Sequence, residues 1–206
     1  MKTLILNGSP RKNGDTMTWL KEFINGLDGE YKIVNAYKCN IKPCIDCRHC
    51  WENEGCCQKD EMQEVYKYIQ ECDNILIASP IYFSELTGQL LAIMSRLQTY
   101  WCARFFRKVD PIAKKKRGGV LLVGGGDGSM EKASDTAVCI LKKMNAELIG
   151  VAYSHNTENI SPIYDNDAMR SMENILVQFN EEEDYRDKNT EYINEKEVIE
   201  AKYCAE

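Results

Sequence analysis

The stretch Thr3-Leu-Ile-Leu-Asn-Gly-Ser-Pro-Arg-Lys-Asn-Gly-Asp-Thr16 decides the fold. Its first five residues form a short apolar run that ends at a glycine, a pattern typical of a strand buried on both faces of a parallel sheet. A polar loop follows, and apolar residues then recur at helical spacing: Met17, Leu20, Phe23, Ile24 and Leu27. This order of strand, glycine-containing loop and helix predicts the first unit of an α/β sheet.

The polar loop has the chemistry of a phosphate site. A helix N-terminus leaves backbone N–H groups unpaired and carries a partial positive charge. Side chains that can donate hydrogen bonds to a phosphate lie in the same loop: Ser9, Arg11, Asn13 and Thr16. The dinucleotide fingerprint and the P-loop are both excluded, because Gly8 and Gly14 have neither spacing and Asp15 follows Gly14. A capped turn without a ligand is the alternative interpretation.

Further apolar runs predict strands over residues 31–37, 74–79, 119–123 and 147–153. Helical periodicity predicts helices over residues 62–69 after a cap at Asp60, 85–100, 130–145 and 165–179. This regular alternation predicts a doubly wound, five-stranded parallel sheet in the order 2-1-3-4-5. We expect one domain over residues 1–180, followed by an acidic tail over residues 181–206.

In this strand order, the loops after the first, third and fourth strands meet at the carboxyl edge of the sheet. The third strand leads into Ser79-Pro-Ile-Tyr-Phe83, where proline turns the backbone out of the sheet. The fourth leads into a glycine-rich loop at 124–129, which lets backbone N–H groups approach a ligand. We therefore expect one ligand crevice that admits a flat ring. For Tyr82 and Phe83, burial under the next helix is an equal alternative.

Composition limits the function. The 206 residues carry a formal net charge of −6, which argues against a general affinity for nucleic acid or an anionic membrane. The basic run Lys114-Lys-Lys-Arg117 is expected to be a solvated turn. No export signal and no apolar run of membrane-spanning length is visible. We expect a soluble, cytoplasmic protein whose cysteines stay reduced.

The most unusual segment is cysteine-rich and spans residues 39–60. Cys44, Cys47 and Cys50 have C-x2-C-x2-C spacing, and Cys56 follows, so four thiolates could meet at one iron–sulfur centre. Zinc, a pocket without metal and thiol redox chemistry stay open as alternatives. Trp51 is expected to cover the site or an interface. Three other cysteines fall in helical patterns and are expected to be buried as small hydrophobic residues: Cys72, Cys102 and Cys139.

Four motifs together resemble the flavodoxin-like NADPH-dependent FMN reductases, and among them the iron–sulfur flavoproteins. They are Gly8-Ser-Pro-Arg11 with Thr16, Pro43-Cys44, Ser79-Pro-Ile-Tyr-Phe83 and the loop at Gly124. The resemblance covers about residues 1–155. It implies that the FMN phosphate is held by Ser9, Arg11, Asn13 and Thr16. It also implies that the isoalloxazine is bordered by Pro80, Ile81, Tyr82, Phe83, Gly125, Gly126 and Asp127.

The cysteine motif resembles the [4Fe–4S] ligand set of these flavoproteins. The resemblance implies that the cluster ligands are Cys44, Cys47, Cys50 and Cys56, with Cys57 as the spare candidate for the fourth position. The residues after them, Asp60-Glu61-Met62, resemble the Asp-Asp-Met that follows the motif in the family and favour Cys56 over Cys57.

The expected function is an FMN-dependent oxidoreductase in which the cofactor does the chemistry, so no catalytic acid or base is required. The resemblance implies electrons from NAD(P)H or ferredoxin, a small-molecule or protein acceptor, and a homodimer or homotetramer. Neither nucleic acid nor a membrane is an expected partner. A non-enzymatic electron carrier or redox sensor is one alternative, and a cluster-free NAD(P)H:FMN or quinone reductase is the other.

Overall fold

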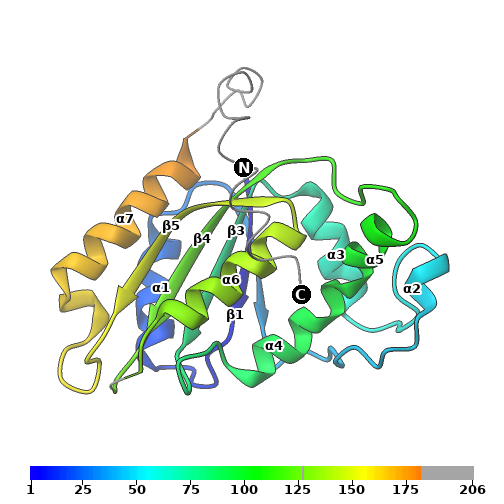
Figure 1. Ribbon diagram of the computed structural model, residues 1–206. Coiled ribbons are helices and arrows are strands. Elements are labelled where there is room, and N and C mark those ends of the chain that lie inside the picture. The colour runs from blue at the N-terminus through cyan, green and yellow to red at the C-terminus, as the bar shows by residue number, and fades with distance from the viewer. Residues whose placement is uncertain (127, 182–206) are drawn as a thin grey trace, which may run out of the picture.

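A five-stranded parallel sheet lies between two layers of helices in the computed structural model, which describes residues 1–126 and 128–181 (Figure 1). The strands are β1 (Lys2–Asn7), β2 (Glu30–Asn35), β3 (Asn74–Pro80), β4 (Lys116–Val123) and β5 (Ala146–Ser154). They pair in the order β2-β1-β3-β4-β5, and every pair is parallel. The predicted fold is confirmed. Asp127 and nearly all of the predicted acidic tail lie outside the described residues.

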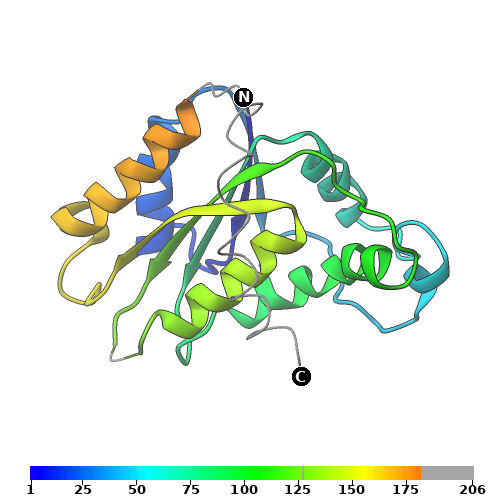
Figure 2. The same ribbon diagram turned by 45° about the horizontal axis from the view of Figure 1, so that its top comes forward.

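The helices are α1 (Asp15–Asn25), α2 (His49–Glu52), α3 (Met62–Glu71), α4 (Gly88–Met94), α5 (Gln98–Phe105), α6 (Glu131–Lys143) and α7 (Asn166–Asn180), with short 3-10 turns η1 (Ser95–Leu97) and η2 (Pro162–Tyr164). Helices α1 and α7 cover one face of the sheet, whereas α3 to α6 cover the other (Figure 2). Among the helices of the described ranges, none combines the length and apolar character needed to cross a bilayer.

Both faces of the sheet are buried, which explains the continuous apolar runs. In β1, Leu4 and Leu6 pack into the core under α3 to α6, whereas Ile5 packs into the core under α1 and α7. In β3, Ile75 and Leu76 divide in the same way. Adjacent strand residues point to opposite faces, so only a run without polar interruptions can fill both cores.

The helix predicted over residues 85–100 is broken in the structure. Residues before Gly88 form a turn, and η1 separates α4 from α5. The Ser95 hydroxyl donates to the Ala92 carbonyl at 2.5 Å and accepts the Cys44 N–H at 2.9 Å. A serine that bonds back to the preceding turn bends a helix. The break therefore sits where the helix meets the cysteine-rich segment.

The basic run at 114–117 is only in part the solvated turn that the sequence predicts: Lys114 and Lys115 are exposed, but the prediction is wrong for Lys116 and Arg117. Lys116 is fully buried and Arg117 nearly so, because both are the first residues of β4, between β3 and β5. The Lys116 ammonium donates to the Lys114 carbonyl at 2.6 Å. Burial, the largest influence, lowers the pKa of Lys116 below its ordinary 10.5.

Replacing Lys116 with methionine should stabilise the fold near neutral pH by about 1 kcal/mol, because it removes a buried charge and keeps the apolar stem. A lysine whose folded pKa is lowered opposes folding while it is charged, so stability rises with pH between the folded pKa and the unfolded 10.5. The advantage of Lys116→Met should therefore fade as the pH approaches 10.5. Urea unfolding of both proteins across this range measures it, and a variant less stable at neutral pH would contradict it.

Candidate functional site

The loop after β1 lies against the end of β3 and the start of α4. The Gly8 N–H donates to the Ala78 carbonyl at 2.8 Å, and the Thr87 hydroxyl donates to the Gly8 carbonyl at 2.9 Å. A Cβ at Gly8 would lie 2.8 Å from the hydroxyl oxygens of Ser79 and Thr87. Only glycine fits this close approach, so the loop is fixed on the neighbouring elements.

The start of α1 offers unpaired backbone donors. Gly14 is its N-cap, and no side chain caps the helix there. Ser9 and Thr16 are buried beside it, whereas Arg11 and Asn13 are exposed. The Ser9 N–H is held by the Asn7 side-chain oxygen at 2.9 Å. An anion such as a phosphate fits this arrangement, because the free N–H groups and the helix dipole both favour negative charge.

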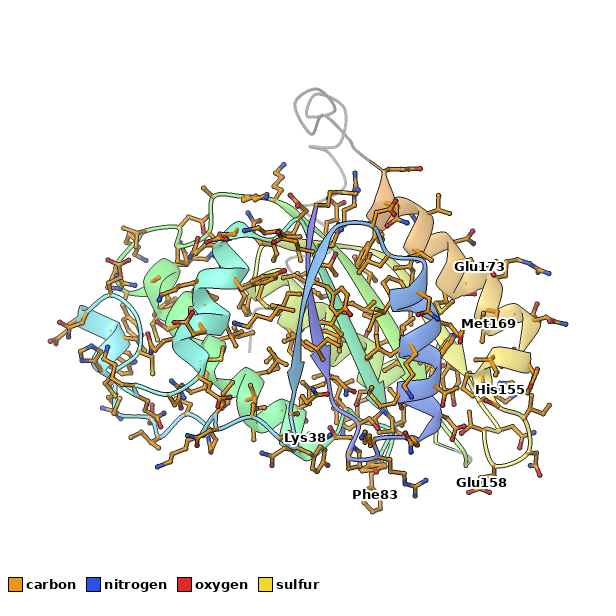
Figure 3. All side chains as sticks on the ribbon, turned by 180° about the vertical axis from the view of Figure 1, so that it is seen from behind. Lys38, Phe83, His155, Glu158, Met169 and Glu173 are labelled. Atoms are coloured by element: carbon orange, nitrogen blue, oxygen red, sulfur yellow. The ribbon has the colours of Figure 1, made fainter. Side chains whose placement is uncertain are left out.

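The turn after β3 holds two residues in a strained backbone conformation. Tyr82 and Glu85 exchange backbone hydrogen bonds of 2.9 and 3.1 Å, and between them Phe83 and Ser84 have φ angles of 54° and 61°. Left-handed backbone is unfavourable for a bulky residue, and such strain concentrates at functional sites. Phe83 is fully exposed at the carboxyl edge of the sheet (Figure 3) and Tyr82 is 43% exposed, so neither is buried under the next helix.

The glycine-rich loop after β4 lies beside the turn after β3. A Cβ at Gly128 would lie 3.5 Å from the Ser84 hydroxyl. The Tyr153 hydroxyl donates to the Gly128 carbonyl at 3.3 Å and fixes the loop from β5. A Cβ at Gly126 would meet nothing within 4 Å, which leaves open space beside that backbone. The three predicted loops thus lie together at the carboxyl edge of the sheet.

The cysteine-rich segment encloses a separate cavity of about 340 Å³ against η1 and α5. Five of its cysteines line the cavity: Cys44, Cys47, Cys50, Cys56 and Cys57. Trp51 stacks on Phe106 with ring centroids 4.3 Å apart, and the Arg48 guanidinium lies 4.9 Å from the Trp51 ring centroid. These contacts fix α2 against the end of α5.

The thiols line one cavity, but their sulfur atoms do not surround a common point. Cys47 Sγ lies 3.2 Å from Cys57 Sγ. Burial, and after it the hydrogen bond with the neighbouring Cys102 thiol, together raise the pKa of Cys50 to about 12. Within residues 1–126 and 128–181, no three His, Cys, Asp or Glu side chains are close enough together to hold a metal ion. The donors fit a metal–thiolate centre in type and in the cavity that they line.

Sequence reasoning missed part of this cavity wall. Cys102 is buried, as predicted, yet it lines the cysteine cavity from α5, as do Ser95 and Arg96 from η1. Helical periodicity signals that a residue is buried, but not what it is buried against. Cys72 is buried as predicted, whereas Cys139 is exposed, so that prediction is wrong. Cys139 lies in α6, whose apolar stripe runs through Ala133, Ala137, Ile140 and Leu141 instead.

Residues 1–158 match the family of NADPH-dependent FMN reductases. The chain belongs to this family. Among curated relatives, it is 28% identical to an iron–sulfur flavoprotein of Archaeoglobus fulgidus over 74% of this chain and 67% of that protein. It is 33% identical to an iron–sulfur flavoprotein of Methanocaldococcus jannaschii over 61% of this chain and 62% of that protein. The chain thus spans about two thirds of the length of these relatives.

Solved structures agree on the fold of this FMN reductase family member. An NAD(P)H:quinone oxidoreductase from Methanothermobacter marburgensis superposes with a TM-score of 0.68, at 16% identity, over 89% of this chain and 99% of that one. An NADH:FMN oxidoreductase in its apo form superposes with a TM-score of 0.59, at 16% identity, over 87% of this chain and 88% of that one. The family establishes an FMN-dependent oxidoreductase, as the sequence motifs predict.

Proposed function

We propose that the chain transfers electrons from NAD(P)H or ferredoxin through bound FMN and a [4Fe–4S] cluster to a small-molecule or protein acceptor. The observation that carries this proposal is the pairing of two sites on one short helix. Thr87, the N-cap of α4, bonds to the phosphate loop, and Ser95, its C-cap, bonds to Cys44. The seven residues of α4 are about 10 Å long, so the two sites are close neighbours.

In this proposal the three loops hold FMN. The phosphate lies at the start of α1, where Ser9, Arg11, Asn13 and Thr16 surround it. The isoalloxazine would be held by the turn of Pro80, Ile81, Tyr82 and Phe83 and by the loop of Gly125 and Gly126, while the predicted contact Asp127 lies outside the described residues. Backbone N–H groups of these loops favour the reduced, anionic flavin, because donors that are already oriented stabilise charge without reorganisation. FMN supplies two-electron chemistry with the donor and one-electron chemistry with the next centre.

The cysteine cavity holds the cluster on Cys44, Cys47, Cys50 and Cys56. Soft thiolates favour iron–sulfur clusters, and the cavity walls of Trp51, Trp101 and Cys102 limit access of water, which affects the reduction potential. Zinc would bind the same four thiolates but would carry no electrons.

We further propose that the protein works as a homodimer or homotetramer. Three aromatic side chains at the end of α5 support this assembly, because Trp101, Phe105 and Phe106 are between 36% and 54% exposed and in contact with one another. Trp101 stacks on Phe105, and Phe106 meets both rings edge-on. Exposed aromatic clusters of this kind mark interaction surfaces. Light scattering in solution tests the assembly, and a monomeric mass would contradict it.

The closest rival is a non-enzymatic electron carrier or redox sensor that exchanges electrons with a protein partner. Steady-state oxidation of NADH or NADPH with a quinone as acceptor separates the two functions. Sustained turnover supports the oxidoreductase. Failure to turn over with either nucleotide, together with rapid reduction by ferredoxin, would support the carrier instead.

Replacing Phe83 with glycine should stabilise the fold but weaken binding of an aromatic acceptor. Glycine adopts φ 54° without strain, so the free energy of unfolding should rise by up to about 1 kcal/mol. The lost ring should raise the KM for an aromatic quinone several-fold, because Phe83 is the most exposed aromatic ring of that turn. The matched control is Ser84→Gly, which relieves the neighbouring strain and keeps the ring. Equal KM values in both variants would contradict a role for Phe83.

A further inference from the structure

The two ends of the cysteine-rich segment are joined by one buried arginine. The Arg96 guanidinium donates to the Lys42 carbonyl at 2.9 Å, just before the first cysteine of the cavity. It donates to the Asp60 carboxylate at 2.7 Å and to the Gln58 carbonyl at 3.4 Å, just after the last cysteine. The Arg96 side chain is fully buried and that of Asp60 is 10% exposed. Arg96 therefore joins the two ends of the segment, which we call its neck: Lys42 on one side and Gln58 and Asp60 on the other.

Other hydrogen bonds reinforce this neck. The Asp60 carboxylate also accepts hydrogen bonds from two backbone N–H groups, those of Lys42 at 3.2 Å and Met62 at 3.1 Å. The Gln58 side chain donates to the Pro43 carbonyl at 3.0 Å. Burial raises the pKa of Asp60, but the hydrogen bond from Arg96 and those from the backbone lower it on balance, so the pair is ionic.

One nitrogen of the Arg96 guanidinium has no hydrogen-bond partner among the described residues. This nitrogen is Nε, and its N–H is buried. Buried donors are almost always paired, and an unpaired one costs about 1–3 kcal/mol. Arg96 also lines the cysteine cavity. An acceptor inside that cavity, such as a thiolate or a sulfide, would satisfy the free donor.

We propose that Arg96 is the positioning residue of the cysteine cavity: it fixes both ends of the segment, and its charge and free Nε–H act on the anionic metal–thiolate centre inside. This inference rests on the proposed function. Hydrogen bonds and positive charge near cluster sulfurs stabilise the reduced, more negative state, so Arg96 raises the reduction potential. Asp60 has the opposite electrostatic effect, because its negative charge opposes reduction.

The test compares Arg96→Gln, Asp60→Asn and the matched control Arg104→Gln in the holoprotein. Arg104, in the neighbouring helix α5, forms a more exposed ion pair with Asp110 at 3.1 Å, outside the neck. Two quantities are measured anaerobically: the midpoint potential of the metal centre, and the rate at which a chelator removes its iron. Both neck variants should release iron about 10-fold faster or more, as is typical when residues supporting metal ligands are lost.

The midpoint potentials give the decisive contrast. Arg96→Gln should lower the potential because it removes a positive charge and a donor, and Asp60→Asn should raise it because it removes a negative charge. A merely structural role would move both in the same direction. Unchanged potentials, or shifts of equal sign, would overturn the inference. Arg104→Gln should leave both quantities as in the wild type.

Two further outcomes are distinguishable. If Arg96→Gln loses FMN and its far-ultraviolet dichroism, it has failed to fold. Asp60→Asn is then compared with the wild type: a raised midpoint potential supports the inference, and an unchanged or lowered one overturns it. If wild-type protein holds no iron, the proposed cluster fails by itself, and cysteine alkylation in the metal-free chains tests the neck. Arg96→Gln should then react several-fold faster than Arg104→Gln, and equal rates would overturn the positioning role.

Discussion

Replacing Cys47 with serine should abolish the iron–sulfur centre and leave FMN bound. Serine is a hard, poorly acidic oxygen ligand, and an iron–sulfur cluster requires soft thiolates. Iron and acid-labile sulfide should fall from about four per chain to well below one. The flavin should stay at the wild-type level, because its loops lie at the other end of α4. Metal analysis with flavin fluorescence after heat release measures both.

Two controls identify the ligands within the cavity. Cys139→Ser changes an exposed cysteine on α6 and should keep iron, sulfide and flavin. Cys57→Ser tests the spare thiol, which lies 3.2 Å from Cys47. It should retain the cluster if Cys56 is the fourth ligand, and Cys56→Ser should lose it. Iron retained in the Cys47 variant would contradict the ligand assignment.

Removing two hydroxyls from the phosphate loop should have the second large effect. The double variant Ser9→Ala, Thr16→Val loses two donors beside the start of α1. A hydrogen bond to a charged group is worth about 1.5 kcal/mol or more, so FMN affinity should fall about 100-fold. Riboflavin, which lacks the phosphate, should bind with unchanged affinity. Fluorescence titration of the apoprotein with both flavins measures the contrast.

Thr18→Val is the matched control for this loop. Thr18 also lies in the first turns of α1, but its hydroxyl donates to the Gly14 carbonyl at 3.2 Å. This variant should bind FMN like the wild type. A double variant that loses affinity for riboflavin as strongly as for FMN would contradict phosphate binding at this loop.

The fold could be predicted because its decisive signals are local. The strands are apolar on both faces, and the loops after them carry glycine or proline where the chain turns. The break at Ser95 could not be predicted in this way, because the hydroxyl that bends the helix is held by Cys44, a residue of a distant segment. Likewise, Lys116 looks like a solvated charge in sequence and becomes buried only through pairing with its neighbouring strands.

The candidate site divides in the same way. The flavin loops follow strands whose order the sequence predicts, so their meeting could be foreseen. The cavity wall formed by Arg96 and Cys102 could not, because each contacts residues about fifty positions away along the chain. A polar residue within a helical pattern carries no sign of the distant carbonyls that it will bind. Such long-range contacts require the folded structure.

The most direct test of the account is the content of the protein purified without oxygen: FMN, iron and acid-labile sulfide per chain, with the visible spectrum before and after reduction. We expect about one FMN and about four each of iron and sulfide, with a broad shoulder beyond the flavin bands that bleaches on reduction. Flavin bands alone, or zinc in place of iron, would contradict the claim that the cysteine cavity holds the electron partner of the flavin.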